Sequence, residues 1–149
     1  MRPRTTGHPA EALSWIEQGD PFDVALLDMQ MPEMDGLMLA AAIRRTRDAE
    51  ELPLAILTSM GDPAPAAEMK RLGLAALVTK PIKPSQLFDV LASILAGQPL
   101  RGLPGAETGS GQFDAKLGQQ WPLHILLAED HPTNPVSYTH LRAHETVLD

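Results

Sequence analysis

Apolar runs and amphipathic stretches alternate along the first two thirds of this chain. Three short apolar runs read as buried strands: Val24–Leu27, Leu54–Leu57 and Ala75–Thr79. Stretches with apolar residues at helical spacing lie around them and predict helices over 9–18, 37–45, 63–72 and 84–95. Strands that alternate with helices favour a parallel sheet with helices on both faces, which is an α/β fold.

The pattern changes after Gly97. Residues 97–122 are rich in Gly, Pro, Ser and Gln and are typical of a linker. A further apolar run, Leu123–Ala128, predicts another strand, which ends in the paired carboxylates Glu129 and Asp130. Paired carboxylates suit a hard divalent cation, because such ions prefer oxygen ligands. The sequence beyond Asn134 does not continue this alternation.

Composition excludes several classes of partner. The formal net charge is -7, with only 12 Lys and Arg residues in 149 and no basic cluster, so we expect no nucleic-acid partner and no contact with an anionic membrane. No apolar stretch reaches the length of about 18 to 20 residues that a membrane span needs. The chain has no Cys, which is compatible with a reducing, cytoplasmic location.

Three of the predicted strands end in side chains with complementary chemistry. Asp28 follows the first apolar run, Thr58 the second and Lys80 the third. Each alone has an ordinary explanation, as a turn, a helix cap or a surface lysine. Because the carboxyl ends of parallel strands meet at one edge of the sheet, we expect the three to lie together. An acid, a hydroxyl and an amine at one edge indicate phosphoryl transfer.

The motifs around these residues resemble the receiver domain of response regulators. They are Leu-Leu-Asp-Met-Gln-Met-Pro-Glu-Met-Asp-Gly from Leu26, Ile-Leu-Thr-Ser from Ile56, and Val-Thr-Lys-Pro-Ile-Lys-Pro from Val78. The resemblance implies a doubly wound, flavodoxin-like parallel sheet of order 2-1-3-4-5. It also implies transfer of a phosphoryl group from the phosphohistidine of a histidine kinase or histidine phosphotransfer domain.

The same resemblance assigns roles to individual residues. Asp28 would be the phosphoacceptor, Thr58 the hydroxyl that hydrogen-bonds the phosphoryl group, and Lys80 the cation that offsets its charge. Mg²⁺ would be held by Asp28, the backbone carbonyl of Gln30, and Glu129 with Asp130. A cis peptide would precede Pro81.

The resemblance also predicts the domain organisation. Residues 1–96 would be an N-terminally truncated receiver without its first strand and helix, since residues 1–8 are too short for the missing elements and the first strand follows at Val24. Residues 123–135 resemble the opening strand of a second receiver, so the chain is similar to the tandem-receiver part of a hybrid histidine kinase. Residues 136–149 match a translated transposase-type sequencing adapter, and we expect them to be an artefact.

Two other functions stay open at this point. A phosphatase of the haloacid-dehalogenase type also uses a strand-end Asp, a Thr or Ser and a Lys, but it needs a second acid where Gln30 stands. A fragment that is not phosphorylated and only binds partners is the other possibility. We expect a signalling module and not a standalone enzyme.

One structural hypothesis connects the two ends of the chain. A receiver without its first strand would lack a central strand and leave unpaired sheet edges. The linker has a root-mean-square span of roughly 25 to 30 Å, which is comparable to the width of a small domain. We therefore predict that Ile125–Leu127 pairs in parallel with Val24–Leu27 and brings Glu129 and Asp130 beside Asp28.

Overall fold

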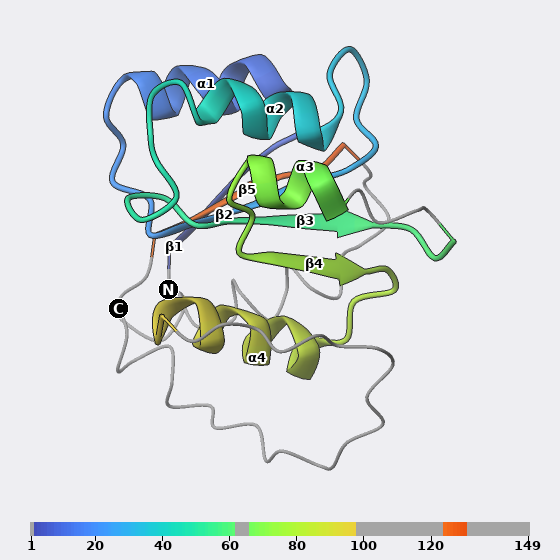
Figure 1. The fold of residues 1–149 in the computed structure, drawn as a ribbon. Coiled ribbons are helices and arrows are strands. Elements are labelled where there is room, and N and C mark those ends of the chain that lie inside the picture. Colours follow the sequence, from blue (N-terminus) through green and yellow to red (C-terminus); the bar gives the residue numbers. More distant parts are fainter. Residues whose placement is uncertain (1, 62–65, 98–123, 131–149) are drawn as a thin grey trace, which may run out of the picture.

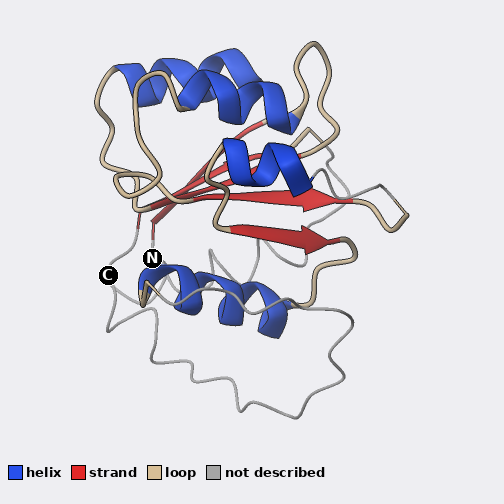
Figure 2. Ribbon diagram, in the orientation of Figure 1, coloured by secondary structure: helices blue, strands red, loops and turns tan. Residues whose placement is uncertain are grey.

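The computed structural model describes residues 2–61, 66–97 and 124–130. These residues form a five-stranded, fully parallel sheet of order β1-β5-β2-β3-β4, with helices on both faces (Figures 1 and 2). The strands are β1 (Arg2–Thr6), β2 (Val24–Asp28), β3 (Leu54–Thr58), β4 (Ala76–Thr79) and β5 (His124–Ala128). The helices are α1 (Pro9–Glu17), α2 (Gly36–Ile43), α3 (Ala66–Arg71) and α4 (Pro84–Leu95). The predicted α/β class and doubly wound sheet are confirmed.

The last strand enters the middle of the sheet, as predicted. β5 pairs in parallel with β2, with Ile125 opposite Val24 and Leu127 opposite Leu26. On its other side β5 pairs in parallel with β1. β5 therefore occupies the place of the first strand in the 2-1-3-4-5 order, although it comes last in the chain.

The expectation that the first strand lies at Val24 is wrong. Arg2–Thr6 already forms β1, which pairs with β5. The sequence hides this strand because it lies at the end of the sheet order, where most of its side chains face solvent and only Thr6 is buried. An edge strand with charged and Pro residues lacks the apolar run that marks a central strand.

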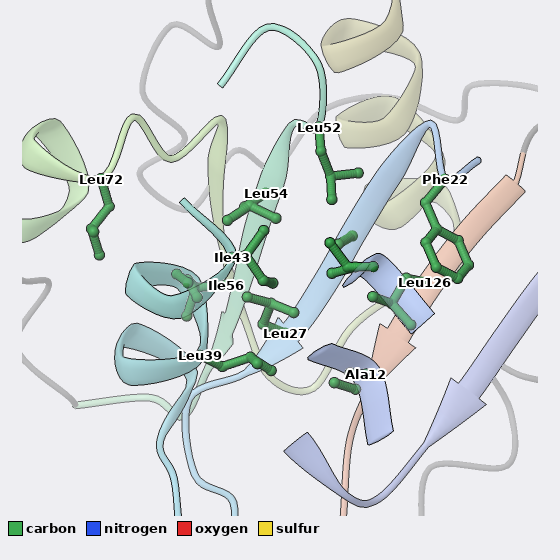
Figure 3. Packing of buried hydrophobic residues seen from close by; sticks show 14 of the residues in the cluster. Ala12, Phe22, Leu27, Leu39, Ile43, Leu52, Leu54, Ile56, Leu72 and Leu126 are labelled. Carbon is green, nitrogen blue, oxygen red and sulfur yellow. The ribbon is translucent and has the colours of Figure 1, made fainter. Parts of the chain in front are cut away.

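Alternate side chains of each central strand enter two separate cores. One core lies between the sheet and α1 and α2, and Figure 3 shows Leu27, Ile56 and Leu126 packed there with residues of the two helices. The second lies between the sheet and α4, which in the described part of the chain is the single helix on that face (Figure 1). It is formed by Val24, Leu26, Ala55, Leu57, Ala76, Val78, Leu87, Val90, Leu91, Ile125 and Leu127.

The ends of the helices follow local rules. Pro9 and Pro84 stand in the first turns of α1 and α4, where a missing N–H costs no hydrogen bond. The Asp35 side chain caps α2 by accepting a hydrogen bond from the Met38 N–H at 2.7 Å. Gly97 follows α4 with φ 63°, a left-handed conformation that glycine adopts without strain.

Arg44, which follows the last residue of α2, holds together the segments that precede β3 and β4. Its guanidinium donates hydrogen bonds to the backbone carbonyls of Leu72 at 2.7 Å, Leu52 at 2.9 Å and Asp48 at 3.0 Å. Burial lowers the pKa of Arg44, and the charge of Asp48 partly opposes that shift. One side chain therefore joins α2, the loop before β3 and the end of α3.

Several expectations lie outside the described residues. They are the linker over most of 97–122, the start of the helix predicted from Pro63, the part of the second-receiver opening beyond Asp130, and the adapter-like segment 136–149. No described helix is both long enough and apolar enough to cross a membrane.

Candidate phosphoacceptor site

Three strand ends converge on one ammonium group. Lys80, directly after β4, places its Nζ 2.8 Å from Oδ2 of Asp28 at the end of β2. The same Nζ lies 3.1 Å from Oε1 of Glu129, directly after β5. The structure therefore brings together residues that are far apart in the sequence, as the strand-end pattern predicts.

The backbone fixes this convergence. The Met29 N–H donates to the Leu57 carbonyl at 2.8 Å, and the Lys80 N–H donates to the Thr58 carbonyl at 2.7 Å. On the other side, the Glu129 N–H donates to the Thr6 carbonyl at 3.0 Å. Because each strand end is hydrogen-bonded to its neighbour, the side chains that follow cannot drift apart without breaking the sheet ladder.

The charges of the site are mostly buried. The side chains of Asp28 and Glu129 are 4% and 3% exposed, and that of Lys80 is 23% exposed. Burial by itself would lower the pKa of Lys80, but hydrogen bonds to Asp28 and Glu129 and the charges of both carboxylates outweigh it, so the pKa is raised. Lys80 is thus a fixed positive charge between two acids.

Both oxygens of Asp28 are oriented. Oδ1 accepts a hydrogen bond from the Gln30 backbone N–H at 3.1 Å, and Oδ2 accepts from Lys80. A carboxylate has about four lone-pair sites, so these two contacts leave acceptor capacity on each oxygen. Gln30 therefore touches the site through its backbone, where a haloacid-dehalogenase phosphatase would need an acid.

Thr58 and Asp130 are the remaining predicted site residues, and they differ in burial. Thr58 is the last residue of β3 and is 4% exposed, one position beyond the residue that is opposite Asp28 in the sheet. Asp130 is exposed, and its Cα lies beside Gly7 in the loop after β1. The peptide between Lys80 and Pro81 is cis, as the resemblance implies.

Two supporting residues were not recognised from the sequence. Gly36 lies so close to the end of β2 that a Cβ there would be 2.5 Å from the Asp28 carbonyl oxygen. Asp23 accepts a hydrogen bond from the His124 N–H at 2.6 Å, and the Asp23 N–H donates to the His124 carbonyl at 2.7 Å. The Asp-Gly dipeptide at 35–36 was a signal for the first, but no local pattern marks the second.

The donor set suits a hard divalent cation. In the described part of the chain, no three acidic or histidine side chains gather closely enough to hold a metal by themselves. Mg²⁺, however, is usually held by one or two carboxylates together with water and other oxygens. Asp28 and Glu129 provide two buried carboxylates against the single charge of Lys80, so their chemistry fits such an ion.

The comparisons with known proteins agree with this geometry. The profile of the response regulator receiver domain family matches residues 2–92, and the chain therefore belongs to that family. Receiver domains are the phosphoacceptor modules of two-component signalling, and members generally bind Mg²⁺ and interact with histidine kinases or phosphotransfer domains.

Three relatives illustrate the range of the match. The cyclic di-GMP phosphodiesterase response regulator RpfG of Xanthomonas campestris is 38% identical over 89 residues, which are 60% of this chain and 23% of that protein. Hybrid signal transduction histidine kinase L of Dictyostelium discoideum is 32% identical over 87 residues, 55% of this chain and 5% of that protein. The Vibrio cholerae chemotaxis protein CheY4 structure matches with a TM-score of 0.55 and 29% identity, covering 62% and 76% of the two chains.

Proposed function

We propose that Asp28 receives the phosphoryl group and that a histidine kinase or a histidine phosphotransfer domain donates it. The observation that carries this proposal is the position of Lys80 Nζ, 2.8 Å from Asp28 and 3.1 Å from Glu129, at the carboxyl edge of the sheet. Asp35, the other aspartate in the same motif, is exposed and serves to cap α2.

In the proposed reaction, an oxygen of Asp28 attacks the phosphorus of the phosphohistidine. The P–O bond to Asp28 forms while the P–N bond breaks, and the imidazole leaves with the electron pair of that bond and takes up a proton. Asp28 is held for in-line attack by the Gln30 N–H on Oδ1 and by Lys80 on Oδ2. Such positioning is the larger part of catalysis in phosphoryl transfer.

The other residues stabilise the charge on the phosphoryl oxygens. Lys80 supplies a permanent ammonium, and the Thr58 hydroxyl donates a hydrogen bond to one phosphoryl oxygen. Mg²⁺ would be held by Asp28, Glu129, the Gln30 carbonyl and Asp130. When bound, it would supply a second positive charge next to the phosphoryl oxygens. A chain that forms this acyl phosphate is a signalling module, and its output depends on surfaces that respond to the new charge.

Acetyl phosphate labelling tests the assignment of Asp28. We expect the wild-type chain with Mg²⁺ to gain one phosphoryl group on Asp28, located by mass spectrometry after borohydride trapping. Asp28→Asn should remove the label, whereas the matched control Asp35→Asn should keep it, because Asn still caps a helix. Label on Asp35, or full labelling of Asp28→Asn, would show that the acceptor is another residue.

We also propose that residues 123–135 are the start of a second receiver and that the parent protein is a hybrid histidine kinase. The Glu-Asp pair that follows β5, together with the similarity to a hybrid kinase, supports this proposal. The uninterrupted genomic sequence of the gene tests it. We expect receiver sequence to continue after Asn134, in place of the adapter-like residues 136–149, and a different continuation would contradict it.

A further inference from the structure

The stretch that matches the receiver family is shorter than the stretch that forms the receiver-like sheet. The family match covers residues 2–92, which contain β1, β2, β3 and β4. The fifth strand, β5, lies outside the match and reaches the sheet only after residues 96–123. The matched stretch therefore has a slot between β1 and β2 that is filled by a strand from elsewhere.

The slot binds its strand over the whole length. Each residue from His124 to Ala128 is opposite a residue of β1, and Ile125 to Ala128 are also opposite residues of β2. Ile125, Leu126 and Ala128 are fully buried and Leu127 is 4% exposed, with alternate side chains in the two cores. Backbone pairing on both sides supplies affinity, and the buried side chains supply selectivity.

Polar contacts at both ends fix the register of the bound strand. At the start, Asp23 exchanges two hydrogen bonds with the backbone of His124, at 2.6 and 2.7 Å, and Nδ1 of His124 lies 3.0 Å from the Pro21 carbonyl oxygen. At the end, Glu129 pairs with Lys80. A shift by one residue would lose both ends and exchange the two faces, so the slot selects one segment in one register.

We propose that this slot is an acceptor site for a strand donated by another molecule, and that its partner is a second copy of this chain. All the contacts just described involve β5 itself, and they are equally available to the β5 of another copy. The connection of residues 96–123 spans at most roughly 90 to 100 Å when fully extended, enough to reach a neighbouring molecule. Reciprocal exchange gives a symmetric dimer in which Glu129 of each site comes from the partner. The proposal does not depend on phosphoryl transfer.

The protein concentration determines whether the slot takes the chain's own β5 or the β5 of a second copy. A connection of this length holds its own strand at an effective concentration on the order of mM. At μM concentration the chain should therefore fold as a monomer, and exchange should become substantial only when it refolds near mM concentration. Once formed, the dimer should persist on dilution, because separation requires the removal of a central strand.

Refolding of the full chain at several concentrations tests the exchange. The chain is refolded from urea at about 10 μM and near 1 mM, diluted to the same μM concentration, and analysed by size exclusion with light scattering. We expect monomer from the dilute sample and a persistent dimer from the concentrated one. A chain that is monomeric after both treatments would overturn the proposal for a second copy.

Rescue by a peptide tests the acceptor site separately. Full-length Leu126→Asp places a charge at a fully buried position of the chain's own strand, so we expect it to lose its fold while its slot residues are unchanged. Adding a wild-type peptide of residues 122–131 should restore the circular dichroism of the native sheet and give saturable binding. The same peptide with Leu126→Asp should not bind, and a Glu129→Gln peptide should bind about tenfold more weakly.

Each alternative outcome of the rescue decides against the acceptor site. If Leu126→Asp folds like the wild type without peptide, the slot needs no strand. If Leu126→Asp stays unfolded with saturating wild-type peptide, the slot does not accept a strand from another molecule. Equal rescue by the wild-type and Leu126→Asp peptides would show unspecific adsorption and would likewise contradict the proposal.

Discussion

β2 and β5 lie side by side in the centre of the sheet and are nearly equivalent in structure. β2 is buried along its whole length, and β5 from Ile125 to Ala128. Each has a parallel neighbour on both sides, and each sends alternate residues into the two cores. Each also leads directly to a carboxylate that contacts Lys80: Asp28 in one case and Glu129 in the other.

The two strands differ in their position along the sequence. β2 stands between α1 and α2 inside the stretch that matches the receiver family, whereas β5 lies beyond that stretch. The comparison shows that a place in the centre of the sheet is specified by a continuous apolar run and by contacts at the strand ends. Continuity of sequence is not required for it. Four experiments can weaken or sharpen this equivalence.

The largest effect is expected from matched truncations in the two strands, both in the same core. Leu27 in β2 and Leu126 in β5 are both fully buried in the core under α1 and α2 (Figure 3). Leu→Ala at either position should lower the free energy of unfolding by about 2 to 5 kcal/mol, measured by urea denaturation. A loss at Leu27 with an unchanged midpoint for Leu126→Ala would show that β5 is not an integral strand.

Substitutions of two glycines test how tightly the backbone is packed at the ends of β2 and β5. A Cβ on Gly36 would lie 2.5 Å from the Asp28 carbonyl oxygen, so Gly36→Ala must displace backbone and should destabilise by about 1 to 3 kcal/mol. A Cβ on Gly7 would meet the Glu129 carbonyl oxygen only at 3.6 Å. Gly7→Ala should therefore be neutral or stabilising by up to about 1 kcal/mol. Equal thermal destabilisation by both substitutions would contradict the difference in packing.

The central strands were predictable because both of their faces are apolar. Continuous apolar runs located the central strands β2, β3 and β5 and also the edge strand β4, and the apolar spacing after Pro84 located α4. β1 was not predictable, since Arg2, Pro3 and Arg4 carry no apolar pattern and only pairing with β5 makes this segment a strand. The place of β5 required a topological argument about the missing strand and not a local signal.

The site was predictable to a different extent. Asp28, Thr58, Lys80 and Glu129 could be named because each follows an apolar run, and the ends of parallel strands share one edge. The exposed position of Asp130 and the contact of Asp23 with His124 could not, because they depend on how loops distant in the sequence meet. Arg44 was missed for the same reason: its carbonyl partners come from two separate loops.

Double-mutant cycles at Lys80 compare the two strands at the site. We expect the Lys80→Met, Asp28→Asn cycle and the Lys80→Met, Glu129→Gln cycle each to give a coupling energy of about 1 kcal/mol in the absence of divalent cations. The Asp28 coupling should be the larger, because its contact is 2.8 Å and that of Glu129 is 3.1 Å. Zero coupling to Glu129 would mean that the end of β5 is not seated beside Lys80.

The smallest effect concerns the start of β5. Asp23→Asn keeps the shape of the side chain and an oxygen acceptor, but it replaces a charge-assisted hydrogen bond to the His124 N–H by a neutral one. The free energy of unfolding should fall by only about 0.5 to 1 kcal/mol. The substitution should make local opening easier at the start of β5 only. Asp23 holds the first residue of β5, and the pairing of Ile125 to Ala128 with β2 is untouched. Amide hydrogen exchange measured by NMR should therefore quicken at His124 and leave the amides of Ala25 to Leu27 unchanged. If exchange quickens equally along both strands, the contact governs docking of the whole strand, and β5 is then less independent of its end contacts than β2.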